Sequence, residues 1–90
     1  MSTDDATTRP IRVTLYTRND CHLCEEMDAV VDRVARDIPL TTEHVDVDTD
    51  PELAAEYGTE VPVLCVNGRK AFKYRVDERT LRARLAREPR

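Results

Sequence analysis

The sequence predicts an α/β fold, a four-stranded mixed sheet with three helices packed on it, in the order β-α-β-α-β-β-α. Three observations predict this class. The apolar period changes from two residues to about 3.6 after the first segment, a short segment bounded by proline and glycine follows the second strand, and an Asn-Gly turn separates the last two strand-like runs. A strand–helix–strand unit returns to its sheet in parallel, whereas a two-residue turn joins antiparallel strands, so the sheet is mixed.

The first half of the chain reads as strand, helix and strand. Residues 11–16 alternate apolar and polar side chains, which is the period of a half-buried strand. A helix is expected over residues 23–38, and Pro39 ends it because a residue that precedes proline avoids helical backbone. A second, weaker strand is expected over about residues 42–47. The helix would present one apolar stripe, formed by Leu23, Met27, Val30, Val31, Val34 and Ile38.

A short helix is expected before the third strand. Asp50 and Pro51 form a favourable helix start, with an N-cap carboxylate followed by a proline at the first helical position. Gly58 is expected to end this helix as a left-handed C-terminal cap. Residues 61–66 are apolar at both alternating sets of positions, as in a central strand covered on both faces.

The C-terminal third reads as a hairpin followed by a helix. Asn67 and Gly68 both tolerate positive φ, which a type I′ hairpin turn requires. This turn would join the strand at 61–66 to an antiparallel strand over about residues 69–75. Asp77 is then expected to cap the last helix.

Length and composition limit the classes of protein to which this chain can belong. Ninety residues form one domain, expected over residues 11–87 behind a flexible N-terminal segment of residues 1–10. The net charge of −4 argues against general nucleic-acid binding. The first ten residues are polar and resemble neither a signal peptide nor a membrane anchor, and no other stretch has the roughly 20 apolar residues that span a bilayer. We therefore expect a cytoplasmic protein with neither nucleic acid nor a membrane as partner.

Cys21 and Cys24 are the candidate catalytic residues. In a reducing compartment, three cysteines indicate redox or metal chemistry more than a structural disulfide framework. The two cysteines stand three residues apart where the first helix begins. Their Cα atoms can therefore lie ~5–6 Å apart, the separation that a disulfide needs. Cys21 lies at the helix N-terminus, where free N–H groups and the helix dipole favour the reactive thiolate. Cys24 lies one turn further in and can attack a mixed disulfide formed at Cys21.

Charged neighbours act on the Cys21 thiolate in both directions. Arg18 favours it, as does His22 when protonated, whereas nearby carboxylates disfavour it. His22 is interpreted equally as an ordinary helix-start residue or as a residue that tunes the thiolate. The opposing carboxylates are Asp20, Glu25, Glu26 and Asp28.

A zinc site is the alternative use of a Cys-x-x-Cys spacing. Zinc takes four ligands, and beyond the pair the only candidates are Cys65, His22 and His44, with no second Cys-x-x-Cys and no histidine pair. No metal or other cofactor is therefore expected. Cys65 is interpreted as a buried, inert residue in the third strand, and His44 as an exposed residue of the second strand.

At this point the pattern resembles the thioredoxin-fold superfamily and, within it, the small glutaredoxin-like proteins. The resemblance covers about residues 11 to 87. It rests on Leu15-Tyr16-Thr17-Arg18 leading into Cys21-His22-Leu23-Cys24, on the acidic second strand, on Val61-Pro62-Val63 and on the final hairpin and helix.

The resemblance implies a thioredoxin-like fold of glutaredoxin size and assigns roles to the cysteines. Cys21 would be the nucleophile and Cys24 the resolving thiol. The peptide bond between Val61 and Pro62 would be cis, with the proline facing the cysteine pair. The residues expected to contact substrate are Arg18, His22, Leu23, Val61 and Pro62.

The chain departs from typical glutaredoxins at two places. Glutaredoxins have Pro-Tyr between the cysteines, where this chain has His22-Leu23. They also have Gly-Gly followed by Asp before the last helix, which holds glutathione, where this chain has Arg75-Val76-Asp77. The departures argue against glutathione as the ligand and leave the dithiol chemistry intact.

The predicted function is that of a thiol–disulfide oxidoreductase. Its substrate would be a disulfide-containing protein or a small disulfide, and its electron donor a reductase or a low-molecular-weight thiol. A monomer is expected. The alternative is a redox-sensing or iron–sulfur carrying thioredoxin-fold module, which an absorbance spectrum separates because a cluster is coloured and a dithiol is not.

Overall fold

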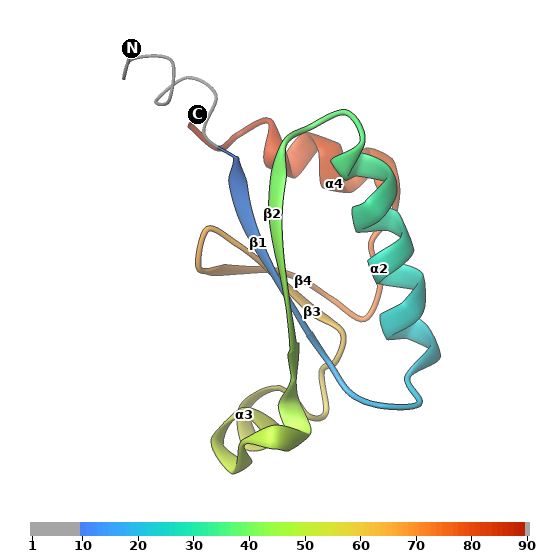
Figure 1. Cartoon of the computed structure of the whole chain (residues 1–90), viewed down its shortest axis with the longest axis vertical. Helices are drawn as coiled ribbons and strands as arrows, with labels where there is room; N and C mark the ends of the chain where they lie inside the picture. The colour runs from blue at the N-terminus through green and yellow to red at the C-terminus, as the bar shows by residue number, and fades with distance from the viewer. Residues whose placement is uncertain (1–9, 90) are drawn as a thin grey trace.

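The computed structural model describes residues 10–89 (Figure 1). The expected flexible segment, residues 1–10, lies outside the described residues except for Pro10. The elements are β1 (Ile11–Thr17), α2 (His22–Ala35), β2 (Leu40–Asp46), the 3₁₀ turn η1 (Val47–Thr49), α3 (Pro51–Tyr57), β3 (Val63–Val66), β4 (Arg69–Lys73) and α4 (Glu78–Leu85). The predicted order, β-α-β-α-β-β-α, is confirmed.

The four strands form one mixed sheet in the order β2-β1-β3-β4. β1 pairs with β2 in parallel and with β3 in antiparallel orientation, and β3 pairs antiparallel with β4. Leu15 lies at the centre, opposite His44 on β2 and Leu64 on β3. Asn67 and Gly68 have φ of 49° and 86°, the positive values expected for the turn between β3 and β4.

The main core lies between one face of the sheet and two helices. Figure 1 shows α2 and α4 on the same side of the sheet, and the two helices contact one another. An ion pair joins them at the surface, where Arg33 lies 3.3 Å from Glu78. Four residues of the predicted stripe, Met27, Val30, Val31 and Val34, are buried, whereas Leu23 and Ile38 are half-buried. The core consists of Ile11, Val13, Leu15, Met27, Val30, Val31, Val34, Leu64, Val66, Leu81 and Leu85.

The short helix α3 lies at the end of the sheet where β2 finishes (Figure 1). Its Tyr57 ring stacks on Tyr16 of β1, with ring centroids 4.2 Å apart. Burial, together with the neighbouring Tyr16, raises the pKa of Tyr57 to about 12. Cys65 of β3 is buried, with 5% of its surface exposed, and this burial raises the pKa of its thiol. The prediction that Cys65 is buried is confirmed.

Strand and helix ends differ from the sequence prediction for local reasons. α2 ends at Ala35 and not at Ile38, because the N–H groups of Asp37 and Ile38 both donate to the Val34 carbonyl and close a tight turn before Pro39. Ile38 still packs against the core, so the apolar spacing continues after the helical backbone has ended.

The strands also shift. β2 begins at Leu40, two residues earlier than predicted, because its register with β1 pairs Leu40 with Ile11. β3 begins at Val63, since Pro62 has no N–H to donate to the ladder. β4 ends at Lys73, because the chain turns at Tyr74.

The prediction for Gly58 is correct in position and wrong in conformation. Gly58 is the C-cap of α3, but its φ of −57° lies in the right-handed region. A side chain there would meet the Ala54 carbonyl oxygen and would come within 3.1 Å of the Arg18 guanidinium. Glycine is required at this position because two neighbours approach closely, and not because the backbone is left-handed.

Within the described range, 10–89, no helix has the length and apolar character needed to cross a bilayer.

Candidate active site

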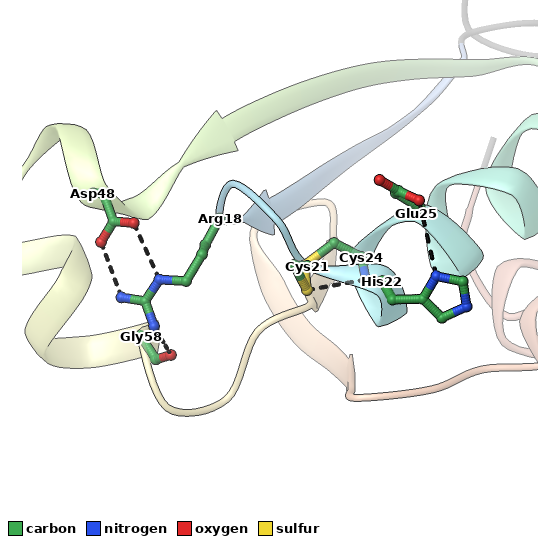
Figure 2. The surroundings of a disulfide bond; sticks show 7 residues. All are labelled: Arg18, Cys21, His22, Cys24, Glu25, Asp48 and Gly58. Atoms are coloured by element: carbon green, nitrogen blue, oxygen red, sulfur yellow. Dashed lines mark hydrogen bonds and ion pairs between the residues drawn. A yellow bond between two sulfur atoms is a disulfide. The ribbon is translucent and has the colours of Figure 1, made fainter.

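The loop between β1 and α2 places the two cysteines at the start of the first long helix. Asp20, with φ of 58°, turns the chain, and Cys21 takes the extended N-cap conformation that precedes α2. The Cys21 sulfur accepts a hydrogen bond from the backbone N–H of Cys24 at 3.1 Å. The two cysteines are joined by a disulfide with their Cα atoms 5.2 Å apart (Figure 2). The spacing therefore brings the sulfurs together as the sequence predicts.

Exposure differs between the two cysteines. Cys21 is half-buried, whereas Cys24 is buried with 4% of its surface exposed. A substrate disulfide can approach Cys21 from solvent. The sulfur of Cys24 is covered, and its bonding partner is Cys21. This asymmetry favours Cys21 as the attacking sulfur.

His22 points away from the sulfurs. Its Nε2 lies 2.9 Å from Glu26 and its Nδ1 lies 4.0 Å from Glu25, and Figure 2 shows the ring turned toward Glu25 along the helix. Glu26 also lies 3.7 Å from Arg75 in the loop before α4. These contacts fit the interpretation of His22 as a helix-start residue better than its interpretation as a tuner of the thiolate.

Arg18 ties the active-site loop to the 3₁₀ turn after β2 and to the end of α3. Its guanidinium donates to both carboxylate oxygens of Asp48, at 2.9 and 3.1 Å, and to the Gly58 carbonyl at 2.9 Å (Figure 2). Hydrogen bonding between the two side chains lowers the pKa of Asp48 and raises that of Arg18. Three of the Arg18 N–H groups are engaged with Asp48 and Gly58, which holds the loop in place, and the expected contact of Arg18 with substrate stays a prediction.

A cleft of about 220 Å³ opens beside the disulfide, between the β1–α2 loop and β2. His44 and Asp28 meet in this cleft, with His44 Nε2 2.8 Å from Asp28 Oδ1. His44 is exposed as predicted, but its pairing was missed, because the two residues stand on different elements. No sequence pattern links the two residues, since the parallel register of β1 and β2 is what places His44 beside Leu15. The cleft is lined by Thr17, Arg18, Asn19, Asp20, Cys21, Cys24, Glu25, Asp28 and His44.

A larger groove of about 640 Å³ lies on the other flank of α2. Leu23, which stands between the cysteines, lines it together with Tyr74 of the loop before α4. The peptide bond between Val61 and Pro62 is cis, as the resemblance implies. The carbonyl of Pro62 accepts a hydrogen bond from the Tyr74 N–H at 2.8 Å, which connects the segment before β3 to the groove. The apolar lining consists of Leu23, Met27, Ala29, Val30, Phe72, Tyr74 and Val76.

No group of three or more histidine, cysteine or carboxylate side chains within residues 10–89 is placed to hold a metal ion. Cys21 and Cys24 form a disulfide with one another. Cys65 is buried on the face of the sheet opposite the main core.

Asp77 is the N-cap of α4, as predicted. Its side chain accepts a hydrogen bond from the Thr80 N–H at 2.7 Å. This bond is the main reason why the pKa of Asp77 lies below its ordinary value of 3.8. A depressed folded-state pKa means that the ionised carboxylate stabilises the fold above pH 3.8. This contribution is lost as the pH falls through the lower folded-state value.

Asp77→Ala is therefore expected to lower the melting temperature at neutral pH, and the deficit should shrink below about pH 4. Thermal unfolding followed by circular dichroism at several pH values measures this. Asp77→Asn is the matched control, since asparagine also caps helices and should keep most of the stability at neutral pH. A deficit for Asp77→Ala that does not change with pH would show that the carboxylate charge contributes nothing.

The chain is similar in sequence and in structure to several known proteins. Residues 12–86 match the family described as "Glutaredoxin-like domain (DUF836)". An uncharacterized protein of Mycobacterium tuberculosis is 33% identical over 81 residues, which cover 84% of this chain and 84% of that protein. A thioredoxin of Methanocaldococcus jannaschii is 32% identical over 65 residues, covering 69% of this chain and 76% of that protein. An X-ray structure of a protein from X. campestris has 37% identity and a TM-score of 0.72, covering 86% of this chain and 99% of the other.

Proposed function

Because the chain belongs to the glutaredoxin-like family of the thioredoxin fold, we propose that it is a dithiol oxidoreductase that reduces disulfides through Cys21 and Cys24. The observation that carries the proposal is the asymmetric pair at a helix N-terminus. The reachable Cys21 caps α2, and the buried Cys24 lies at disulfide distance behind it. Leu23, Val61 and Pro62 are proposed to border the bound substrate, and the cell's cytoplasm is the proposed compartment.

The proposed reaction transfers two electrons and two protons to the substrate. The Cys21 thiolate attacks one sulfur of the substrate disulfide, a bond forms between these two sulfurs, and the second substrate sulfur leaves as a thiolate that takes a proton. Cys24 then loses its proton and attacks the Cys21 sulfur, which releases the first substrate sulfur as a thiol. The product is the disulfide of Cys21 and Cys24, and an external dithiol or reductase returns the two electrons.

The proposal is tested by reduction of insulin with dithiothreitol as the electron donor. The protein at micromolar concentration is expected to accelerate insulin precipitation well above the rate with dithiothreitol alone. The as-purified protein is expected to be colourless and to show two thiols that become reactive on reduction. A rate equal to that of dithiothreitol alone would contradict the proposed activity.

Glutathione is expected to be a poor reductant, and the loop before α4 supplies the physical reason. A glutathione carboxylate would need free N–H groups at the N-terminus of α4, and Asp77 already accepts one of them. Asp77 and Glu78 also place negative charge there, and Arg75 faces Glu26 at 3.7 Å. A carboxylate ligand therefore meets repulsion where it would dock.

The test compares glutathione with 2-mercaptoethanol as reductants of the oxidised pair at equal thiolate concentration. Both rates are expected to rise linearly with concentration and to agree within about tenfold, as for thiols that react without a binding site. Trapping with iodoacetamide followed by mass spectrometry measures the reduced fraction. Saturation by glutathione below millimolar concentration would show that this chain has an ordinary glutathione site despite lacking the glycines.

A further inference from the structure

Tyr74 has a backbone conformation that its side chain disfavours. Its φ is 70°, in the left-handed region, where bulky residues are rare because Cβ comes too close to the following carbonyl oxygen. Between residues 10 and 89, the other residues with positive φ are Asp20, Asn67 and Gly68, which are residue types that tolerate this region. Strained residues persist where the surrounding structure holds them, and they concentrate at binding and catalytic sites.

Two hydrogen bonds hold Tyr74 in place. Its N–H donates to the Pro62 carbonyl at 2.8 Å, and its phenol O–H donates to the Thr59 carbonyl at 3.3 Å. Both acceptors belong to the segment that leads into β3. The main chain and the ring of Tyr74 are therefore fixed against the segment that carries Val61 and Pro62.

Burial in the core does not explain why an aromatic residue stands at position 74. Tyr74 is 43% exposed, and among residues 10–89 it is the only large hydrophobic side chain classed as exposed. It lines the groove of about 640 Å³ together with Leu23, so the groove reaches the residue that directly precedes Cys24 in the chain. An aromatic ring at this position offers a flat apolar surface to a polypeptide that enters the groove.

We propose that Tyr74 is a specificity-determining residue whose ring contacts the polypeptide that flanks a substrate disulfide, which favours protein disulfides over small ones. The inference rests on the proposed function. The groove runs along α2 from Leu23, and its lining includes the apolar side chains of Met27, Val30 and Phe72 beside charged residues. A protein segment with an apolar residue next to its cysteine can fill this space, whereas a small disulfide attached at Cys21 cannot extend into it.

The test uses Tyr74→Asn, because asparagine adopts positive φ readily and removes the ring. The KM for insulin is expected to rise about fivefold, the size of a lost aromatic contact, with kcat changed less than about twofold. The second-order rate with which bis(2-hydroxyethyl) disulfide oxidises the reduced protein is expected to stay the same. Tyr74→Phe is the matched control, since it keeps the ring and loses only the bond to Thr59, and it should keep the wild-type KM.

Each outcome decides the inference. An unchanged KM for insulin in Tyr74→Asn, or an equal loss with both disulfides, would overturn the role of the ring while leaving the proposed function intact. A rise in KM for Tyr74→Phe as large as that for Tyr74→Asn would show that the hydroxyl bond to Thr59 matters and the ring does not. A wild-type protein that reduces neither disulfide would overturn the proposed function and this inference with it.

Discussion

Cys21→Ser is expected to abolish disulfide reduction, and Cys24→Ser is expected to accumulate a mixed disulfide at Cys21. Removal of a nucleophile lowers turnover by on the order of a thousandfold or more, because serine does not form a stable bond to sulfur under these conditions. In Cys24→Ser the first exchange still occurs, but no second sulfur releases the product. The insulin assay measures turnover, and mass spectrometry under non-reducing conditions measures the trapped adduct.

Cys65→Ala is the matched control for the cysteine substitutions. Cys65 is buried on the sheet face opposite the main core, so its removal should leave turnover within about twofold of wild type. The role assignment has a second test in the reduced wild-type protein, where limiting iodoacetamide should label Cys21 before Cys24. Labelling in the reverse order would exchange the two roles.

Leu64→Ala is expected to lower the free energy of unfolding more than Asp77→Ala or Thr41→Ala. Leu64 is fully buried in β3, between Leu15 of β1 and Phe72 of β4, and it packs against the two core helices. Truncation of a buried leucine costs about 2–5 kcal/mol, including the cavity that remains. Small domains have a total unfolding free energy of roughly 5–15 kcal/mol, so the variant should lose a large part of it.

Urea unfolding followed by circular dichroism measures this change. The urea midpoint should fall while the slope stays constant, because the folded topology is retained. Thr41→Ala is the control, since Thr41 is exposed on β2 and its removal should change the unfolding free energy by less than about 0.5 kcal/mol. A loss for Leu64→Ala no larger than that for Thr41→Ala would mean that the core described here does not hold the fold.

Local patterns were sufficient for most of the fold. The alternation over residues 11–16, the Asp50-Pro51 start and the Asn67-Gly68 turn each describe neighbours in the chain, and each was confirmed. The order of strands in the sheet was not predicted, because β1 finds both of its partners far along the chain. The start of β2 was predicted two residues late, because its pairing with β1, which places Leu40 opposite Ile11, decides where it begins.

The candidate site shows the same division. Cys21 and Cys24 could be identified because their spacing and their place at a helix start are local properties. The engagement of Arg18 by Asp48 could not be predicted, and neither could the pairing of His44 with Asp28, because the fold alone brings these residues together. Tyr74 was missed because its unusual backbone conformation leaves no mark in the sequence pattern.

The sulfur of Cys21 is both the proposed reacting atom and the acceptor that closes the first turn of α2. A thiolate is a stronger hydrogen-bond acceptor than a neutral sulfur, so each change in the redox state of Cys21 alters the bond to the Cys24 amide. The chemistry is thereby coupled to the backbone at the end of the helix. The chain has no tryptophan whose fluorescence could report the redox state. The NMR resonance of the Cys24 amide can report it instead, so that exchange is followed without an attached dye.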